Sequence, residues 1–242
     1  MIGLKTVRQG TAFGQSLGLS RAHAHRLAEL ATPDAIQDFI GRIPANHEPD
    51  GDTCRSVAAV LDAGRAHCIE GAFVAACALW LHGRPPLLMD LRAGGGDDDH
   101  VVTLFREGRH WGAISKSNHI WLRWRDPIYR SLRELALSYF HEYVKGADKT
   151  LRSYSMGMDL RRFDPALWVT NLGDCWEVAG ALDDVRHYPL IGRAQARRLR
   201  RRDAFEIEAG RIVEYPKPRS AGRANTAASG RRPPAPKGRG RG

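Results

Sequence analysis

The chain has 242 residues, 43% of them hydrophobic, and a formal net charge of +10, a composition that suits a folded protein with a sizeable core. Its longest apolar run, residues 72–81, is about half as long as a membrane span, which excludes a membrane-spanning helix. Its four cysteines form no CxxC pair and no tight cluster, so the sequence suggests neither a disulfide framework nor a zinc site. We expect a cytoplasmic protein that contacts no membrane and carries neither cofactor nor metal.

The positive charge is concentrated at the C-terminal end. Residues 193–242 contain 15 Lys and Arg against 4 Asp and Glu, a net charge of +11, while the preceding 192 residues carry a net charge of −1. From Pro216 onward Gly, Pro, Ala, Ser and Arg dominate, a composition typical of disorder. The basic character therefore belongs to a tail and not to the folded body.

The first part of the chain predicts short helices. Residues 1–20 predict a flexible lead-in, and residues 20–30 a short helix. Thr32-Pro33-Asp34 is a strong helix start, with Thr as N-cap and Pro at the first helical position, and Pro44 ends that helix. Residues 56–63 predict another short helix, which Gly64 ends.

The next helix begins at Cys68 and is apolar almost all round, which predicts a central, buried position. Its inward face consists of six apolar residues at helical spacing: Ile69, Ala72, Phe73, Ala76, Leu79 and Trp80. A helix start carries free N–H groups and partial positive charge, which favour a thiolate over a thiol. Cys68 is therefore a candidate nucleophile, although a free cysteine also serves as a small core residue.

Strands follow this helix. Residues 87–91 and 100–105 predict two buried strands on either side of a Gly- and Asp-rich loop, and residues 111–118 predict an antiparallel return. Asp126-Pro127 predicts the start of another helix. Helices followed by a run of strands indicate an α+β fold, with N-terminal helices packed on a small antiparallel sheet.

The C-terminal third is less regular. Residues 149–163 predict an edge strand or a loop, and residues 174–184 a short helix. Residues 193–202 predict a basic helix, and residues 205–215 a small hairpin.

Three regions follow from this pattern. Residues 1–50 form a flexible lead-in with N-terminal helices, and residues 51–192 form the core with a helical and loop elaboration at its C-terminal end. Residues 193–242 form a basic, largely disordered tail.

The order of these motifs resembles the transglutaminase-like branch of the papain-like cysteine enzymes. The matching segments are Arg65-Ala-His-Cys68, Gly83-Arg-Pro-Pro-Leu-Leu-Met-Asp-Leu91 and the strand that begins at His100. The resemblance covers residues 53–118, about a quarter of the chain. It implies a transglutaminase-like core in which Cys68 is the nucleophile and His100 is the base that takes its proton.

The assignment of His100 as the base has alternatives. His67 is a rival base, but neighbouring helix residues point about 100° apart, which argues against it. His100 follows three aspartates, residues 97–99, which would raise its pKa, form a solvated charge run or hold a cation.

The third catalytic residue departs from the family pattern, because Ser115 stands where the family has an Asp. Asn118, three residues on, carries an amide that can orient an imidazole. Side chains alternate along a strand, so an even register, such as His100 opposite Asn118, places Asn118 on the His100 face, and an odd register places Ser115 and Ser117 there. We choose Asn118 for its chemistry.

The backbone N–H of Cys68 is the expected oxyanion donor. Thr53, Trp111 and Asn118 are possible side-chain donors, and the sequence selects none of them.

The resulting prediction is a cysteine-dependent amide-bond hydrolase or acyl transferase that acts on a peptide or protein through Cys68, His100 and Asn118. The alternative is a non-catalytic module of the same fold that binds a protein or peptide, which the missing aspartate favours. Residues 193–242 are in addition expected to contact nucleic acid or another acidic partner weakly.

Overall fold

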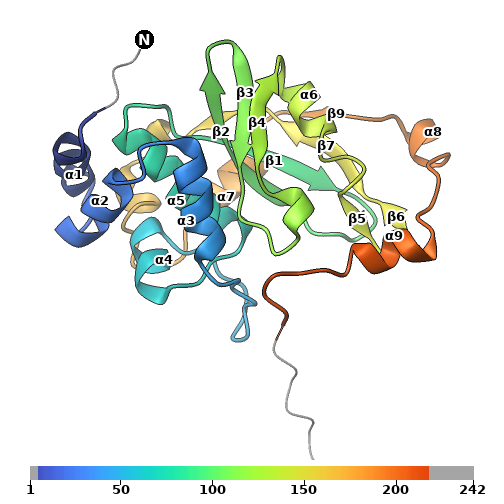
Figure 1. The fold of residues 1–242 in the computed structure, drawn as a ribbon, viewed down its shortest axis with the longest axis horizontal. Coiled ribbons are helices and arrows are strands. Elements are labelled where there is room, and N and C mark those ends of the chain that lie inside the picture. Colours follow the sequence, from blue (N-terminus) through green and yellow to red (C-terminus); the bar gives the residue numbers. More distant parts are fainter. Residues whose placement is uncertain (1–4, 218–242) are drawn as a thin grey trace, which may run out of the picture.

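The structure is a computed structural model that describes residues 5–217 (Figure 1). The α-helices are α1 (Val7–Ser16), α2 (Arg21–Ala28), α3 (Pro33–Arg42), α4 (Val57–Ala63), α5 (Cys68–Leu81), α6 (Leu132–Leu137), α7 (Trp176–Asp183), α8 (Arg193–Ala196) and α9 (Ala204–Ala209). The strands are β1 (Leu87–Ala93), β2 (His100–Glu107), β3 (His110–Ile114), β4 (Arg125–Tyr129), β5 (Val144–Lys145), β6 (Asp148–Lys149), β7 (Leu151–Ser155), β8 (Met158–Asp159) and β9 (His187–Pro189).

The main sheet is antiparallel throughout and runs in the order β4-β3-β2-β1-β7-β9, with β8 paired to β1. A separate two-stranded sheet joins β5 and β6. Helices α1 to α5 precede β1 along the chain, as predicted, while α6 and α7 lie between later strands of the sheet, and the fold is α+β.

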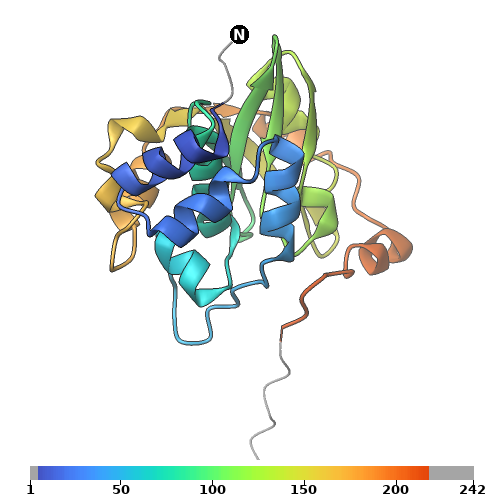
Figure 2. The same cartoon turned by 60° about the vertical axis from the view of Figure 1, so that its left-hand side comes forward.

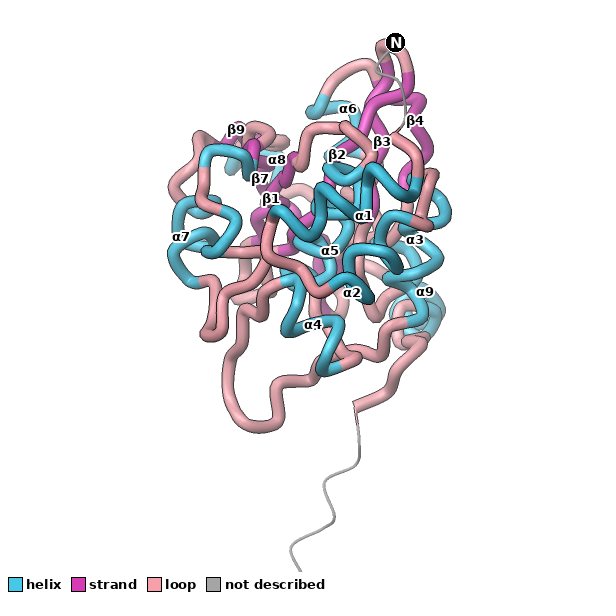
Figure 3. The backbone as a smooth tube through the Cα atoms, turned by 90° about the vertical axis from the view of Figure 1, so that its left-hand side faces the viewer, coloured by secondary structure: helices cyan, strands magenta, loops and turns pink. Residues whose placement is uncertain are grey.

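The helices α1 to α5 lie together on one side of the sheet, as Figures 2 and 3 show. Helix α5 packs directly against β2, where the hydroxyl of Thr103 donates a hydrogen bond of 2.8 Å to the carbonyl of Ala72. Helices α1, α2, α3 and α4 surround α5 and share its hydrophobic cluster. A second cluster fills the other face of the sheet beneath α6.

Helix α5 is central because its side chains leave no polar face. Of its fourteen residues, only Cys68, Ile69 and Trp80 are not fully buried. Its start is defined by Glu70, which accepts a 3.0 Å hydrogen bond from the backbone N–H of His67 and so binds one of the N–H groups that every helix start leaves free. The predicted start at Cys68 is therefore confirmed.

Most of the predicted helices and strands before residue 115 are present, with one correction. Residues 7–16, predicted as part of a flexible lead-in, form α1. The hydroxyl of Thr6 accepts a hydrogen bond from the N–H of Gln9, and the Gln9 side chain accepts one from the N–H of Thr6. This reciprocal cap starts a helix that packs against α2 and α5.

Two predictions after residue 115 are wrong. Residues 125–129 form strand β4 and not the start of a helix, because Arg125 pairs with Ala113 on β3 and its side chain is held by Ser138 and Glu142. Residues 204–209 form helix α9 and not a hairpin, because Asp203 accepts a hydrogen bond from the N–H of Glu206 and caps the helix.

The basic tail is described only in part. The predicted helix over residues 193–202 is limited to α8, and the predicted disorder from Pro216 onward concerns residues 218–242, which lie outside the described residues. Among residues 5–217, no helix has both the length and the apolar character needed to cross a membrane.

The contact between α5 and the segment after β3 gives a first prediction. A Cβ added at Gly71 would lie 2.3 Å from the Cβ of Lys116, whereas a Cβ at Gly180 in α7 would meet nothing within 4 Å. We expect Gly71→Ala to destabilise the fold by about 1–3 kcal/mol through overpacking. Gly180→Ala, the matched control, is expected to be neutral or to stabilise by up to about 1 kcal/mol. Urea unfolding measures both, and a Gly71→Ala variant as stable as Gly180→Ala contradicts the packing.

Candidate cysteine–histidine site

A cavity of about 250 Å³ opens at the N-terminus of α5. All three predicted site residues line it: Cys68, His100 and Asn118. The other lining residues come from the loop after α3, the loop before α5, the loop before β2, the segment after β3 and the start of β5: Ala45, Asn46, His47, Ala66, His67, Asp97, Asp98, Asp99, Lys116, Ser117, His119, Leu122, Tyr143 and Val144. Segments far apart in the sequence therefore converge on the Cys68 thiol.

The thiol of Cys68 is held in the thiolate form. Burial alone would raise its pKa, but hydrogen bonding and charge from the imidazoles of His100 and His67 outweigh burial and lower the pKa to about 5. The N-terminus of α5 adds partial positive charge at the same place. Burial raises the pKa of Cys77, in the same helix, to about 12. Cys68 and Cys77 thus differ in the one property that a nucleophile needs.

His100 begins β2 and is almost fully buried. Its Nε2 lies 2.6 Å from the hydroxyl of Ser115, which leaves Nδ1 as the ring nitrogen for Cys68. The register explains this pairing, because Thr103 pairs with Ile114, which is the odd register that places Ser115 on the His100 face. Ser115 is itself held by Gln37 of α3, whose side chain bonds both its N–H and its carbonyl.

Asn118 lines the cavity but does not orient His100. Its amide donates a hydrogen bond of 2.7 Å to the carbonyl of Tyr215 and accepts one of 2.7 Å from the N–H of the same residue. The choice of Asn118 over Ser115 is therefore corrected: the odd register brings Ser115 to the imidazole.

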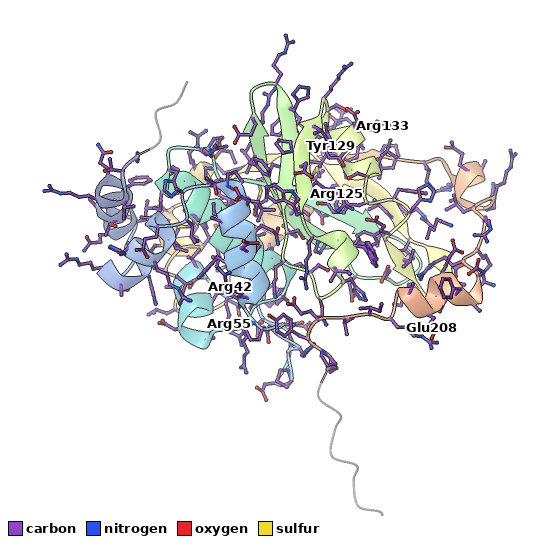
Figure 4. All side chains as sticks on the ribbon, in the orientation of Figure 1. Arg42, Arg55, Arg125, Tyr129, Arg133 and Glu208 are labelled. Atoms are coloured by element: carbon purple, nitrogen blue, oxygen red, sulfur yellow. The ribbon has the colours of Figure 1, made fainter. Side chains whose placement is uncertain are left out.

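A buried carboxylate fixes the loop before α5. The side chain of Glu70 is fully buried and accepts hydrogen bonds from the hydroxyl of Thr53 (2.8 Å), the N–H of Arg55 (3.1 Å) and the N–H of His67 (3.0 Å). Burial alone would raise the pKa of Glu70, but the charge of His67 and these hydrogen bonds lower it. The carboxylate therefore stays ionised at the base of the site; Arg55, labelled in Figure 4, adds an ion pair of 3.5 Å.

His67 is a second imidazole at the thiol, which the sequence argument discounted. Its Nδ1 lies 4.0 Å from the Cys68 sulfur, and its Nε2 lies 2.7 Å from the carbonyl of Thr53. Burial would lower its pKa, but the Cys68 thiolate and Glu70 outweigh burial and raise the pKa to about 9. His67 is thus a fixed cation beside the sulfur. The expectation that its ring points away from Cys68 is wrong, because His67 is the N-cap, where the backbone is extended and the helical angle between neighbours does not apply.

Lys116 also lines the cavity and is buried, with its ammonium bonded to the carbonyl of Ile43. Burial, together with the charge of Arg123, lowers its pKa to about 8.

The positions of the possible oxyanion donors decide which of them can act at Cys68. Trp111 pairs with Arg106 near the far end of β2, and the hydroxyl of Thr53 is bonded to Glu70. The N–H groups in the first turn of α5 remain as donors at the thiol.

Fold and site together define an α+β protein with a cysteine–histidine pair at the start of a buried helix. Neither a protein-family model nor a curated protein matches the sequence. Among solved structures, one of Legionella pneumophila LapG aligns with a TM-score of 0.37 and 15% identity over 74% of this chain and 95% of that one. A structure of EGTA-treated LapG from the same organism aligns with a TM-score of 0.31 and 17% identity over 47% of this chain and 70% of that one. Similarity this low does not establish a shared function, so only the chemistry of the site bears on what this protein does.

The lowered pKa of Cys68 gives a prediction about its reactivity. The rate of alkylation by iodoacetamide is expected to rise with pH around a midpoint of about 5 at Cys68, against about 8.5 for an ordinary cysteine. His100→Gln is expected to move this midpoint to higher pH, because the thiolate loses a partner. Mass spectrometry of the modified peptide measures the rate at each pH. A wild-type midpoint near that of an ordinary cysteine would contradict the electrostatics of the site.

The bond between His100 and Ser115 gives a second prediction. Ser115→Ala leaves a buried imidazole nitrogen without its partner, so we expect a loss of about 1–3 kcal/mol in urea unfolding. Ser16→Ala, the control, removes an exposed serine hydroxyl that donates to the carbonyl of Phe13, and its effect is expected to stay within about 0.5 kcal/mol. Equal effects of the two substitutions would show that the bond between His100 and Ser115 is absent in solution.

Proposed function

We propose that this protein is a cysteine-dependent amide-bond hydrolase whose nucleophile is Cys68 and whose general base is His100. The observation that carries the proposal is the lowered pKa of Cys68, whose sulfur shares an open cavity with the His100 imidazole. We further propose that residues 51–192 form a transglutaminase-like core around this site. Support for the core comes from the helix that begins at Cys68 and packs against the strand that begins at His100.

In the first half of the reaction the Cys68 thiolate attacks the carbonyl carbon of the scissile amide. The carbonyl oxygen gains negative charge, and the N–H groups in the first turn of α5 stabilise it. The protonated His100 gives its proton to the amine as the C–N bond breaks. The amine leaves, and the acyl group remains on the sulfur as a thioester.

In the second half the neutral His100 takes a proton from water, and the hydroxide attacks the thioester. The C–S bond breaks, the carboxylic acid leaves, and the site returns to thiolate and imidazolium. If an amine attacks the thioester in place of water, the acyl group is transferred to that amine. Access of water to the cavity therefore decides between hydrolysis and acyl transfer.

The two imidazoles have different roles in this scheme. His100 is bonded to a neutral hydroxyl at Nε2, which leaves Nδ1 to exchange a proton with the sulfur and the leaving group. His67 lies between a carbonyl, a thiolate and the Glu70 carboxylate, all of which favour its protonated form. His67 is therefore a positioning residue that stabilises the thiolate, and His100 is the catalytic base.

The shape of the cleft supports a polypeptide substrate. The cavity at Cys68 shares His119, Leu122 and Val144 with a second, larger cavity of about 570 Å³. This second cavity continues to α9 and is lined by both apolar and charged side chains. Two adjoining cavities with common walls suit an extended chain better than a small compact molecule.

Variants of these residues test the proposal against a peptide-based acylating probe. Cys68→Ala is expected to abolish both labelling and hydrolysis of a peptide library, and His100→Gln to slow them by about 10²–10⁴. His67→Asn is expected to raise the pH at which activity appears while leaving activity at alkaline pH, because only the stability of the thiolate changes. The wild-type rate is expected to fall as the pH drops through about 5, where Cys68 is protonated.

Cys77→Ala is the matched control, since it removes a buried thiol from the same helix, and it is expected to keep full labelling. Labelling that persists in Cys68→Ala contradicts the proposal. A wild-type protein that stays unlabelled but binds peptides would instead support the non-catalytic binding module.

A further inference from the structure

The chain's own residues Glu214 and Tyr215 contact residues that line or adjoin the Cys68 cavity. After α9 the chain runs back along the lower edge of the molecule toward α3 and α4, as Figure 1 shows. It is fastened at Asn118, which accepts a hydrogen bond of 3.2 Å at its carbonyl from the N–H of Glu214. Asn118 lines the Cys68 cavity, so this segment is attached to a wall of the site.

Asn118 holds the segment as a neighbouring strand would. Its side-chain oxygen accepts from the N–H of Tyr215 and its side-chain nitrogen donates to the carbonyl of Tyr215, both at 2.7 Å. These bonds involve only the main chain of the bound residue, so they fit any extended polypeptide. Asn118 alone therefore sets the register in which a chain binds here.

Side chains on both sides of Asn118 recognise the two bound residues. Arg123 forms an ion pair with the Glu214 carboxylate and is itself held by the carbonyl of Ser117 at 2.9 Å. The Tyr215 hydroxyl donates to the carbonyl of Gly41 at 3.0 Å, and the Lys116 ammonium lies 4.7 Å from the centre of the Tyr215 ring. Each contact recognises a different chemical property of the bound residues: the negative charge of Glu214, the hydroxyl of Tyr215 and the aromatic face of Tyr215.

We propose that Asn118, Arg123 and Lys116 form a polypeptide-binding subsite, that Glu214 and Tyr215 occupy it as an internal ligand, and that substrates present an acidic residue followed by an aromatic one to it. This inference rests on the proposed function, because it names the substrate class of that site. Two of the three residues, Asn118 and Lys116, also line the Cys68 cavity, so a chain bound here is held at a wall of that cavity.

The internal ligand competes with the substrate. A tethered segment has a high effective concentration at its own subsite, so a substrate peptide binds only to the fraction of molecules in which the segment is detached. A subsite that is free in about one molecule in ten weakens the apparent affinity about tenfold. Detaching the segment therefore strengthens peptide binding without altering the subsite.

The test uses the full chain with Cys68→Ala, which prevents turnover, and a fluorescent peptide with the sequence of residues 211–217. Glu214→Ala and Tyr215→Ala are combined to detach the segment, and fluorescence anisotropy measures binding. We expect the combined variant to bind the peptide at least about tenfold more tightly than the parent. Ile212→Ala, an exposed position of the same segment, is the matched control and is expected to bind as the parent does.

A charge reversal tests the subsite itself. In the detached chain, Arg123→Glu is expected to weaken binding of the glutamate-containing peptide and to restore binding of a peptide with arginine at that position. Equal peptide affinity in the parent and the detached chain, or no rescue by the reversed pair, overturns the inference. The binding test uses Cys68→Ala, so its result does not depend on catalysis. If the protein with Cys68 is labelled but the detached Cys68→Ala chain does not bind the peptide, only the subsite is contradicted. If the peptide binds but Cys68 is not labelled, only the proposed enzyme activity is contradicted.

Discussion

The buried carboxylate of Glu70 holds together everything that the site needs. It ties the N–H of His67, which opens α5, to Thr53 and Arg55 on the loop before α4. A buried charge is tolerated only when it is fully bonded, and Glu70 accepts hydrogen bonds from two segments, the loop before α4 and the start of α5, and lies beside the cation of His67. The position of Cys68, the charge of His67 and the direction of the helix N-terminus all follow from this one arrangement.

A carboxylate beside His100 would both orient the ring and supply the electrostatic stabilisation. In this site these two tasks are carried out by different residues. Ser115 orients the His100 ring without adding negative charge to it. The electrostatic part is supplied from the other side, where the Cys68 thiolate and the Glu70 carboxylate together keep His67 protonated next to the sulfur. A serine where a carboxylate is expected is therefore compatible with a stable thiolate, since thiolate stability comes from two imidazoles and a helix terminus.

How far the sequence predicted this arrangement depends on how local each signal is. Cys68 could be found because a helix start has a local signature, and His100 because the order of motifs resembles that of a known family; the structure brings both to one cavity. Ser115 against Asn118 could not be decided, because strand register is set by the turn and by packing on both faces. Strand β4 was missed for a related reason, because Arg125 is fixed by Ser138 and Glu142, partners that apolar spacing does not reveal. Helix α9 does have a local signal, the reciprocal cap between Asp203 and Glu206, which the apolar pattern does not include.

The central claim is that the sulfur of Cys68 and the ring of His100 act on one carbonyl group. A crystal structure of the full chain treated with a peptide aldehyde tests it most directly, because the aldehyde forms a tetrahedral adduct with a reactive thiolate. We expect the adduct on Cys68, its oxygen at the N–H groups of the first turn of α5, and the Nδ1 of His100 within hydrogen-bonding distance of the adduct. An adduct on another cysteine, or a His100 ring turned away from the adduct, would contradict the account.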